Sequence, residues 1–147
     1  MIRSASIKHL DEIVSIEDMM FTNPWSRKQI MHDINLKLAS ENLVYIKDRK
    51  VIAYMLGIKV ADEFHLNNIA VHKKFQRKHI AKKLLFYLVN RLQMQDLKKI
   101  FLEVSARNKP ARRLYESFGF EKEGRRENYY AMGDHAILYY LNLAFNG

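Results

Sequence analysis

The stretch Asn68-Ile69-Ala70-Val71-His72-Lys73-Lys74-Phe75-Gln76-Arg77-Lys78-His79-Ile80-Ala81 decides the fold of this chain. Its apolar start predicts a buried strand, its basic middle predicts a turn, and its end begins a long helix. Backbone N–H groups at a helix N-terminus lack intrahelical partners, and the helix dipole adds partial positive charge there. A basic loop that leads from a strand into a helix therefore predicts a binding site for an anionic phosphate group.

The residues before this stretch predict strands and two helices. A helix opens at Ser6 or Lys8 and runs to about Met20, and Ser26 is a good N-cap for a second helix. That second helix carries its apolar side chains at Ile30, Ile34 and Leu38. Strands are predicted at residues 2–7, 43–46, 51–60 and 64–71, the last three as an antiparallel meander with turns at 48–50 and 61–63.

The residues after it predict two more helices and three more strands. Residues 78–94 carry an apolar stripe with strong helical period, and Asn108 caps a helix that ends before Gly119. Residues 100–104 form a nearly continuous apolar run, which predicts a central strand covered on both faces. Residues 120–126 and 135–143 predict two last strands joined by a Tyr-rich loop. The order of elements indicates a mixed α/β domain with a βαβ unit at 64–104.

Length and composition limit the possible classes of protein. A chain of 147 residues is expected to form one domain, residues 1–147. It has no cysteine, hence no disulfide framework and no thiolate nucleophile, and the six histidines lack the spacing of a zinc site, so we expect no metal. Residues 1–6 lack the apolar region of a signal peptide, and no window is apolar enough to span a membrane, so we expect a cytoplasmic protein with no membrane partner.

The formal net charge of +9 has two interpretations. It indicates a polyanionic partner such as nucleic acid, a ribosome or a phosphorylated cofactor. Alternatively, it reflects lysines and arginines spread over solvated faces, and the charge alone leaves both open. The strongest local excess of basic residues comprises Lys73, Lys74, Arg77, Lys78, His79, Lys82 and Lys83.

Together, these elements and motifs resemble the GCN5-related N-acetyltransferase (GNAT) family. The family pattern Gln/Arg-x-x-Gly-x-Gly/Ala corresponds to residues 76–81, with His79 in place of the central Gly. Residues 101–108, Ala111, 114–120 and 125–130, with the earlier Pro24-Trp25-Ser26, resemble one subfamily, the ribosomal-protein alanine N-acetyltransferases (RimI). The resemblance covers nearly the whole chain. It implies a central, mostly antiparallel sheet with a parallel, splayed pair of strands in the middle, flanked by about four helices.

The resemblance implies acetyl-CoA as the co-substrate. Ile69, Ala70 and Val71 would pair with the pantetheine arm like an extra strand, and the Val71 N–H would face the thioester carbonyl. Asn108 would contact the cofactor arm in addition to capping its helix. The residues implied to hold the pyrophosphate are Arg77, Lys78, His79, Ile80, Ala81 and Lys82. From the residues alone, that segment is also consistent with a basic, solvated helix start.

His79 is the departure from the family pattern. Gly at this point permits positive φ and a close approach of the backbone to the ligand. A His fits the same role only if its backbone is right-handed helical; otherwise its imidazole can contact a phosphate, more strongly when protonated. We therefore predict that cofactor binding is retained with reduced affinity.

Glu103 and Tyr115 are the candidate catalytic side chains. Glu103 interrupts an apolar strand, where burial would raise its pKa and suit it as a general base; the alternatives are a buried ion-pair partner or a solvent-facing strand end. The helical period favours a core role for Tyr115, whereas the resemblance implies a hydroxyl that faces the cofactor sulfur. The resemblance thus implies direct acetyl transfer, with Glu103 as base and Tyr115 as acid, to the N-terminal alanine of the eighteenth small-subunit ribosomal protein.

Two further interpretations concern the acceptor. Residues 125–130 form either a solvated loop or, by resemblance, a flap over the peptide that faces Phe21, Asn23 and Trp25, with Glu127 and Asn128 receiving a basic peptide terminus. One alternative function is acetylation of a lysine side chain, a polyamine or an antibiotic. Another is a basic RNA- or ribosome-binding module that has lost catalysis, which would explain His79 and the net charge.

Overall fold

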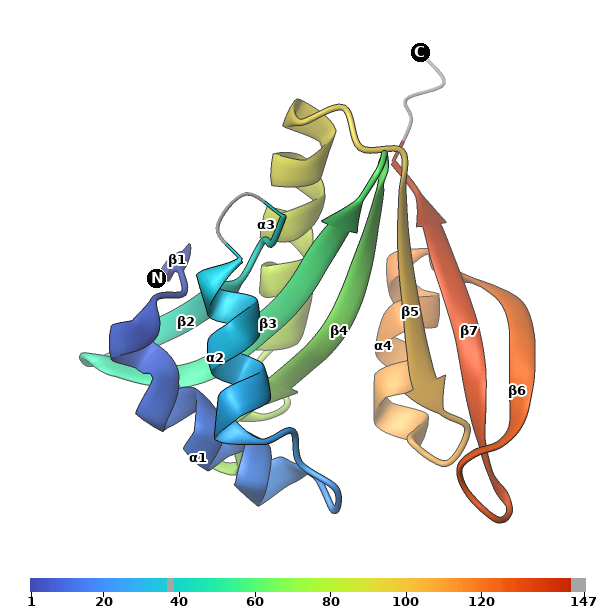
Figure 1. Ribbon diagram of the computed structural model, residues 1–147, viewed down its shortest axis with the longest axis horizontal. Helices are drawn as coiled ribbons and strands as arrows, with labels where there is room; N and C mark the ends of the chain where they lie inside the picture. The colour runs from blue at the N-terminus through green and yellow to red at the C-terminus, as the bar shows by residue number, and fades with distance from the viewer. Residues whose placement is uncertain (37–38, 144–147) are drawn as a thin grey trace.

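A computed structural model describes residues 1–36 and 39–143 of the chain (Figure 1). The helices are α1 (Leu10–Met20), α2 (Arg27–Asn35), α3 (Ile80–Met94) and α4 (Lys109–Phe118), with short 3₁₀ turns at Ile7–His9 and Lys73–Phe75. The strands are β1 (Ile2–Ser4), β2 (Leu43–Lys47), β3 (Lys50–Val60), β4 (Glu63–Val71), β5 (Lys99–Ser105), β6 (Glu121–Ala131) and β7 (Asp134–Asn142). Within the described residues, no helix is both long and apolar enough to cross a membrane.

One mixed sheet runs through the molecule in the order β1-β2-β3-β4-β5-β7-β6. All neighbouring strands are antiparallel except β4 and β5, which are parallel. The β4–β5 pairing extends only from Glu63–Lys99 to Leu66–Leu102, although β4 continues along β3 to Val71 and β5 continues along β7 to Ser105. The two strands therefore diverge toward their carboxyl ends (Figure 1). The expected mixed sheet with a splayed parallel pair is confirmed.

A β-bulge lies where β4 leaves β5. Leu56 pairs with Asn68, but the next residue of β3, Gly57, pairs with Leu66, so Asn67 is the extra residue of β4. Such a bulge bends its strand and increases the local twist. Because the last β4–β5 pair also involves Leu66, the bend coincides with the start of the divergence.

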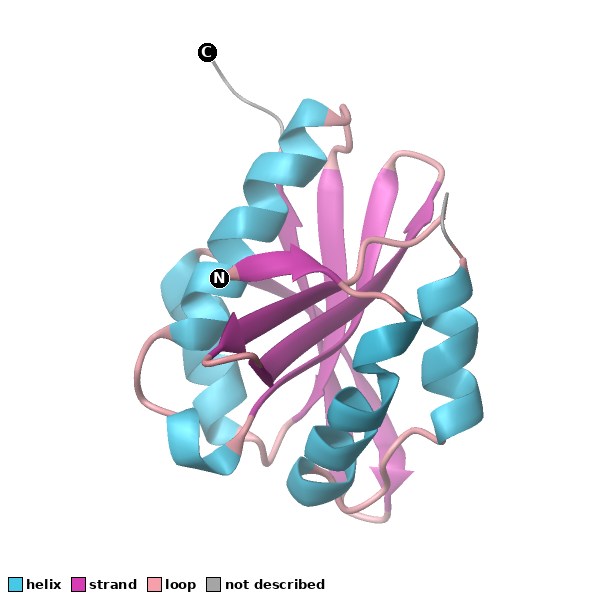
Figure 2. Ribbon diagram, turned by 90° about the vertical axis from the view of Figure 1, so that its left-hand side faces the viewer, coloured by secondary structure: helices cyan, strands magenta, loops and turns pink. Residues whose placement is uncertain are grey.

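Helices cover both faces of the sheet (Figure 2). On one face, α3 and α4 pack on a large apolar cluster that includes Leu84, Leu88 and Tyr115. On the other face, α1 and α2 pack on a second cluster that includes Ile13 and Ile30. This second cluster takes its strand residues from β2, β3 and β4 only, so the same face of β5 remains partly open among the described residues.

Most predicted helix boundaries agree with the structure. Ser26 accepts from the Gln29 N–H in a capping box, and Gly119 has positive φ at the end of α4. The predicted first strand ends earlier, at Ser4, and the first helix begins with a 3₁₀ turn. Leu38, which the pattern places on the second helix, lies outside the described residues.

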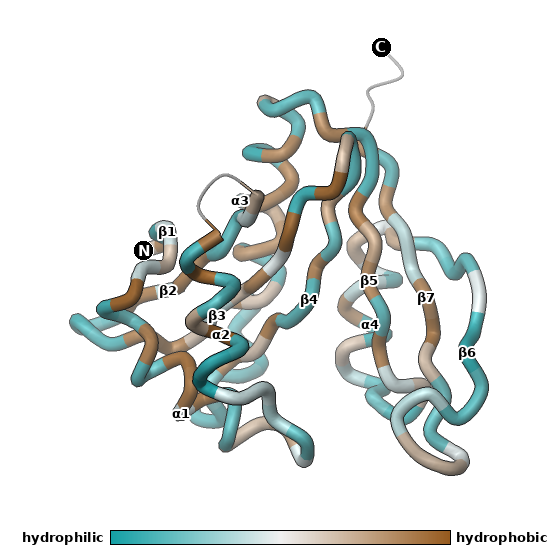
Figure 3. The backbone as a smooth tube through the Cα atoms, in the orientation of Figure 1, coloured by the Kyte–Doolittle hydropathy of each residue, from teal (hydrophilic) through white to brown (hydrophobic). Residues whose placement is uncertain are grey.

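Two predictions about the C-terminal half are wrong. The strand at 100–104 is not covered on both faces, because burial alternates along β5: Ile100, Leu102 and Val104 are buried, and the residues between them are half-buried. The Tyr-rich segment is not a loop, because β6 continues to Ala131 as an exposed edge strand, hydrophilic along most of its length (Figure 3). Tyrosine favours strands, and β7 supplies the partner that the local pattern did not reveal.

Replacing Gly57 with Ala is expected to destabilise the fold. A Cβ at this position would lie 2.1 Å from Phe64 Cζ and 2.8 Å from the His65 carbonyl oxygen, so buried atoms must move. We expect the free energy of unfolding to fall by about 1–3 kcal/mol, as in other overpacked sites, measured by urea denaturation. Gly124→Ala is the matched control, because its Cβ would meet nothing within 4 Å, and we expect a change within about 0.5 kcal/mol. Equal effects of the two substitutions would contradict this account of the bulge.

Candidate active site

A hollow of about 410 Å³ lies beside the diverging strands; we call it the β4–β5 hollow. Its walls come from β4, β5, β6, β7 and the loop between α1 and α2. The lining residues are Trp25, His65, Leu66, Asn67, Phe101, Leu102, Glu103, Arg126, Tyr129, Tyr130 and Leu138. Segments distant in sequence thus meet at one concave site, the usual setting for ligand binding.

Glu103 is the acidic residue that lines this hollow. Its side chain is 30% exposed, and its Oε1 lies 3.2 Å from Nη2 of Arg126 on β6. The predicted burial of Glu103 is therefore wrong, because the strand face that carries it is open at this point. An ion-pair partner, one of the alternatives, is present, and the carboxylate remains accessible from the hollow.

Tyr115 is the α4 residue that points into the core. It is 5% exposed and packs its ring against Phe120, at a centroid distance of 5.5 Å, and Tyr139, at 6.2 Å. Burial, followed by the charge of Tyr130, raises the pKa of the Tyr115 hydroxyl above its ordinary value. The hydroxyl therefore stays protonated at neutral pH. Tyr115 is not among the described residues that line the β4–β5 hollow. This position agrees with the core role that the helical period indicated.

The backbone of β4 presents free polar groups to the side that β5 has left. The His72 N–H donates to the Ile52 carbonyl at 2.7 Å, so these two residues form a hydrogen-bonded antiparallel pair. The preceding pair, Val71 with Ala53, must then be a non-hydrogen-bonded pair, and so must Ile69 with Met55. The N–H groups of Val71 and Ile69 consequently point away from β3. Both are available to an extended ligand between β4 and β5.

The loop before α3 adopts a conformation suited to anions. Arg77 has φ 63°, and His79, the N-cap of α3, has φ 61° and ψ 22°. Alternation of left-handed and other conformations turns successive N–H groups toward one point, as in anion-binding nests. The N–H groups of Ile80, Ala81 and Lys82 follow in the first turn of the helix, where no intrahelical acceptor exists.

We expected His79 to fill the role of the family Gly only if its backbone were right-handed helical. Its backbone is left-handed instead. It has kept the conformation that Gly adopts without strain, so the departure from the family pattern lies in the side chain and not in the path of the backbone. The left-handed conformation costs an L-residue roughly 1–2 kcal/mol of conformational free energy.

We expect His79→Gly to stabilise the protein. Relief of strain should exceed the additional chain entropy of Gly, roughly 0.5–1 kcal/mol, and leave a net gain of about 0.5–1 kcal/mol. That gain corresponds to a rise in Tm of about 1–4 °C by thermal denaturation. His79→Ala is the control, since it removes the imidazole and keeps the strain. A variant His79→Gly that binds acetyl-CoA with unchanged Kd would exclude any role of the imidazole in cofactor binding.

Asn108 caps α4 as predicted. Its Oδ1 accepts from the Ala111 N–H at 3.3 Å, with Pro110 in the first turn. Its contact with the cofactor arm stays a prediction.

The hairpin of β6 and β7 closes one side of the β4–β5 hollow. Arg126, Tyr129 and Tyr130 line the hollow together with Trp25, whereas the role of this segment as a flap over the peptide stays a prediction. Burial and the charge of Glu103 raise the pKa of Tyr130 to about 12, so its hydroxyl also stays protonated. Phe21 and Asn23, predicted with Trp25, are not among the described lining residues.

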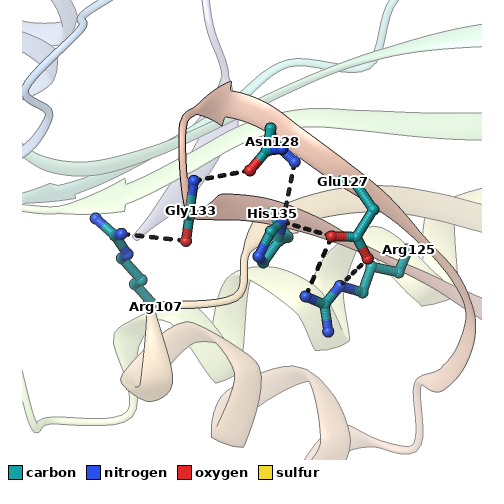
Figure 4. A network of polar contacts seen from close by, with 6 residues as sticks. All are labelled: Arg107, Arg125, Glu127, Asn128, Gly133 and His135. Atoms are coloured by element: carbon teal, nitrogen blue, oxygen red, sulfur yellow. Dashed lines mark hydrogen bonds and ion pairs between the residues drawn. The ribbon is translucent and has the colours of Figure 1, made fainter.

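Glu127 and Asn128 serve the hairpin itself (Figure 4). Glu127 pairs with Arg125 at 2.9 Å and lies 3.1 Å from Nδ1 of His135. Asn128 donates its N–H to the same His135 nitrogen at 2.9 Å and accepts from the Gly133 N–H at 2.7 Å. These contacts hold the turn and leave the predicted reception of a basic peptide terminus without support.

Sequence reasoning missed two features of this site. The sequence shows Arg126 only as part of residues 125–130, interpreted as a solvated loop or a flap, and nothing in the sequence pairs it with Glu103. The bulge residue Asn67 left a weak signal, because Asn67-Asn68 interrupts a strand and asparagine is depleted in strands. Within residues 1–36 and 39–143, no group of three or more His, Cys, Asp or Glu side chains could hold a metal ion.

Comparison with known proteins agrees with this geometry. Residues 10–120 match the Acetyltransferase (GNAT) family. The chain is 34% identical to the ribosomal protein bS18-alanine N-acetyltransferase of Haemophilus ducreyi over 134 residues, 91% of either protein. It is 32% identical to that of Escherichia coli K12 over 133 residues, covering 90% of this chain and 88% of the relative.

Solved structures have the same architecture. The crystal structure of the ribosomal-protein-S18-alanine N-acetyltransferase from Escherichia coli has a TM-score of 0.93 and 31% identity, over 100% of this chain and 96% of that one. A chain of the NatC complex bound to Gag peptide and CoA has a TM-score of 0.84 at 20% identity, over 98% of each chain, which shows a shared fold alone.

Proposed function

The chain belongs to the Acetyltransferase (GNAT) family and is an acetyl-CoA-dependent N-acetyltransferase, and we propose that its acceptor is the N-terminal alanine of a ribosomal protein. The relatives named above act on ribosomal protein bS18 at its alanine, and this similarity supports the same acceptor here. We further propose that residues 1–147 form one N-acetyltransferase domain that works in the cytoplasm.

The observation that carries the proposal is the position of Glu103 on the wall of a hollow beside the free edge of β4. An acyl transfer between two substrates needs both reactants in one site, and such positioning supplies several kcal/mol of the rate enhancement. The free edge of β4 suits the extended pantetheine arm, and the hollow suits the acceptor.

We assign cofactor contacts along this path. Ile69, Ala70 and Val71 hold the arm through the backbone, and the N–H groups from Arg77 to Lys82 hold the pyrophosphate. The Val71 N–H, which points away from β3, stabilises the oxyanion that develops on the thioester carbonyl.

The chemistry is direct transfer. An α-amine has a pKa of about 7.7–8.0, so a substantial fraction is neutral at neutral pH, and only that form attacks the thioester carbon. Glu103 takes the amine proton, and one water relays it from the nitrogen to the carboxylate. When the C–S bond breaks, Tyr115 donates its proton to the departing thiolate, whose conjugate thiol has a pKa of about 8.5.

A peptide panel tests the acceptor. Purified protein is incubated with acetyl-CoA and peptides that differ only in the N-terminal residue, each with its lysine side chains blocked, and products are identified by mass spectrometry. We expect a gain of one acetyl group at the α-amine, most rapidly for alanine. Acetylation confined to unblocked internal lysines, or to a polyamine or an antibiotic, would reject the proposed acceptor.

Ribosome proximity through the basic charge is a second part of the proposal. It predicts binding to RNA that weakens steeply as salt rises. A non-catalytic RNA-binding module, the alternative, would bind RNA with the same salt dependence. Its Tm would not change on addition of acetyl-CoA.

A further inference from the structure

Glu17 is a buried carboxylate outside the proposed chemistry. It lies on α1, is 1% exposed, and receives hydrogen bonds from three other elements. Its Oε1 accepts from the Tyr54 hydroxyl on β3 and from the Asn68 side-chain amide on β4. Its Oε2 accepts from the Trp25 N–H, in the loop before α2, at 2.9 Å. A carboxylate is expensive to bury, and these three donors offset that cost.

The partners of Glu17 connect it to the β4–β5 hollow. The Trp25 side chain lines the hollow, and Glu17 holds the backbone of that same residue. Asn68 directly follows the bulge residue Asn67, which lines the hollow from β4. One carboxylate therefore ties two walls of the hollow together from behind, while Glu17 itself is not among the lining residues.

We propose that Glu17 is a positioning residue for the acceptor: it sets the distance between Trp25 and the β4 bulge, and so the fit of the peptide in the hollow. The effect of Glu17 on acceptor binding rests on the proposed function. The hydrogen bond by which Glu17 holds Trp25 is independent of that function. Burial and the bond to Glu17 raise the pKa of Tyr54, which keeps that hydroxyl available as a donor.

Glu17→Gln is the test, and Glu12→Gln is its matched control. Gln has the same shape as Glu, but one of its terminal atoms is a donor, so at least one of the three donors must turn away or lose its acceptor. Glu12 is also an α1 carboxylate that accepts a backbone N–H, from Val51 at 2.7 Å, and among the described residues no hydrogen bond joins it to Trp25 or β4. Both variants lose stability, and only Glu17→Gln disturbs the hollow.

Two measurements distinguish the effect of Glu17→Gln on the hollow from that of Glu12→Gln. Trp25 is the single tryptophan of the chain, so tryptophan fluorescence, excited at a wavelength that the tyrosines do not absorb, reports on this site alone. In Glu17→Gln we expect its emission to shift to longer wavelength and its quenching by acrylamide to increase. We also expect the KM for the alanine peptide to rise roughly tenfold, as for the loss of one charged hydrogen bond, with the KM for acetyl-CoA changed less than about twofold.

Three results would overturn the proposal that Glu17 positions the acceptor: unchanged Trp25 emission in Glu17→Gln, a parallel rise of both KM values, or the same effect on the acceptor KM in Glu12→Gln. If Glu17→Gln does not fold, Asn68→Ala removes the β4 connection alone, and an unchanged acceptor KM in that variant overturns it as well. Failure of the wild-type protein to acetylate the alanine peptide would reject the proposed acceptor, and the fluorescence comparison would still test the hold on Trp25.

Discussion

Glu103→Gln is expected to lower kcat/KM for the acceptor peptide by about 10²–10⁴-fold, the range that a general base contributes. Gln keeps the shape of the side chain and one oxygen for Arg126, but it cannot take up the amine proton. Because β5 packs its other face into the core, the fold should be little affected. Steady-state kinetics with saturating acetyl-CoA measure the change, and the Kd for acetyl-CoA should stay within about twofold.

Glu127→Gln is the matched control for this experiment. Glu127 also pairs with an arginine, Arg125 at 2.9 Å, on the same hairpin that carries Arg126, but it does not line the β4–β5 hollow. We expect its activity to remain within about twofold of the wild type. If Glu103→Gln kept full kcat/KM, Glu103 would be no more than the ion-pair partner of Arg126.

Tyr115→Phe is expected to lower kcat by about 10²-fold, the lower end of the general-acid range, with KM for acetyl-CoA roughly kept. The variant removes only the hydroxyl, so the ring contacts with Phe120 and Tyr139 remain. The wild-type hydroxyl carries its proton throughout the neutral range, as a donor to the thiolate must, and the burial that raises its pKa also makes it a weaker acid.

Tyr139→Phe is the control that separates chemistry from packing. Tyr139 is fully buried beside Tyr115, and its hydroxyl accepts from Nε of Arg112 at 3.2 Å. Its removal should cost stability, about 1 kcal/mol for one hydrogen bond, without a comparable fall in kcat. Equal kcat for Tyr115→Phe and the wild type would return Tyr115 to the core role that its burial and helical period support.

The sequence predicted those parts of the fold that depend on local chemistry. Ser26, Asn108 and Gly119 mark helix ends through side-chain and backbone preferences that act over a few residues, and all three agree with the structure. The splayed pair was reached through family resemblance, because the end of a strand pairing depends on two segments distant in the chain.

The errors concern contacts between distant segments. Whether Glu103 is buried depends on how far α1 and α2 extend across the sheet, and their apolar cluster takes strand residues only as far as β4. The network of Glu17 was equally hidden, since its donors come from three separate elements. The family pattern has Gly at position 79, and the left-handed backbone of His79 has the conformation that Gly favours, whereas a right-handed helical backbone was the condition expected for a His.

The divergence of β4 and β5 also bears on how the protein avoids association. An unpaired strand edge invites another chain to add a strand, and proteins usually protect the outer edges of their sheets. Here β1, at one outer edge, is only three residues long, and β6, at the other, is exposed and rich in charged side chains. The free edge of β4 lies instead between two strands that are joined at Leu66–Leu102. A slender ligand can enter there, whereas a second sheet meets the wall formed by β5, so the protein keeps an open edge for function without exposing it to aggregation.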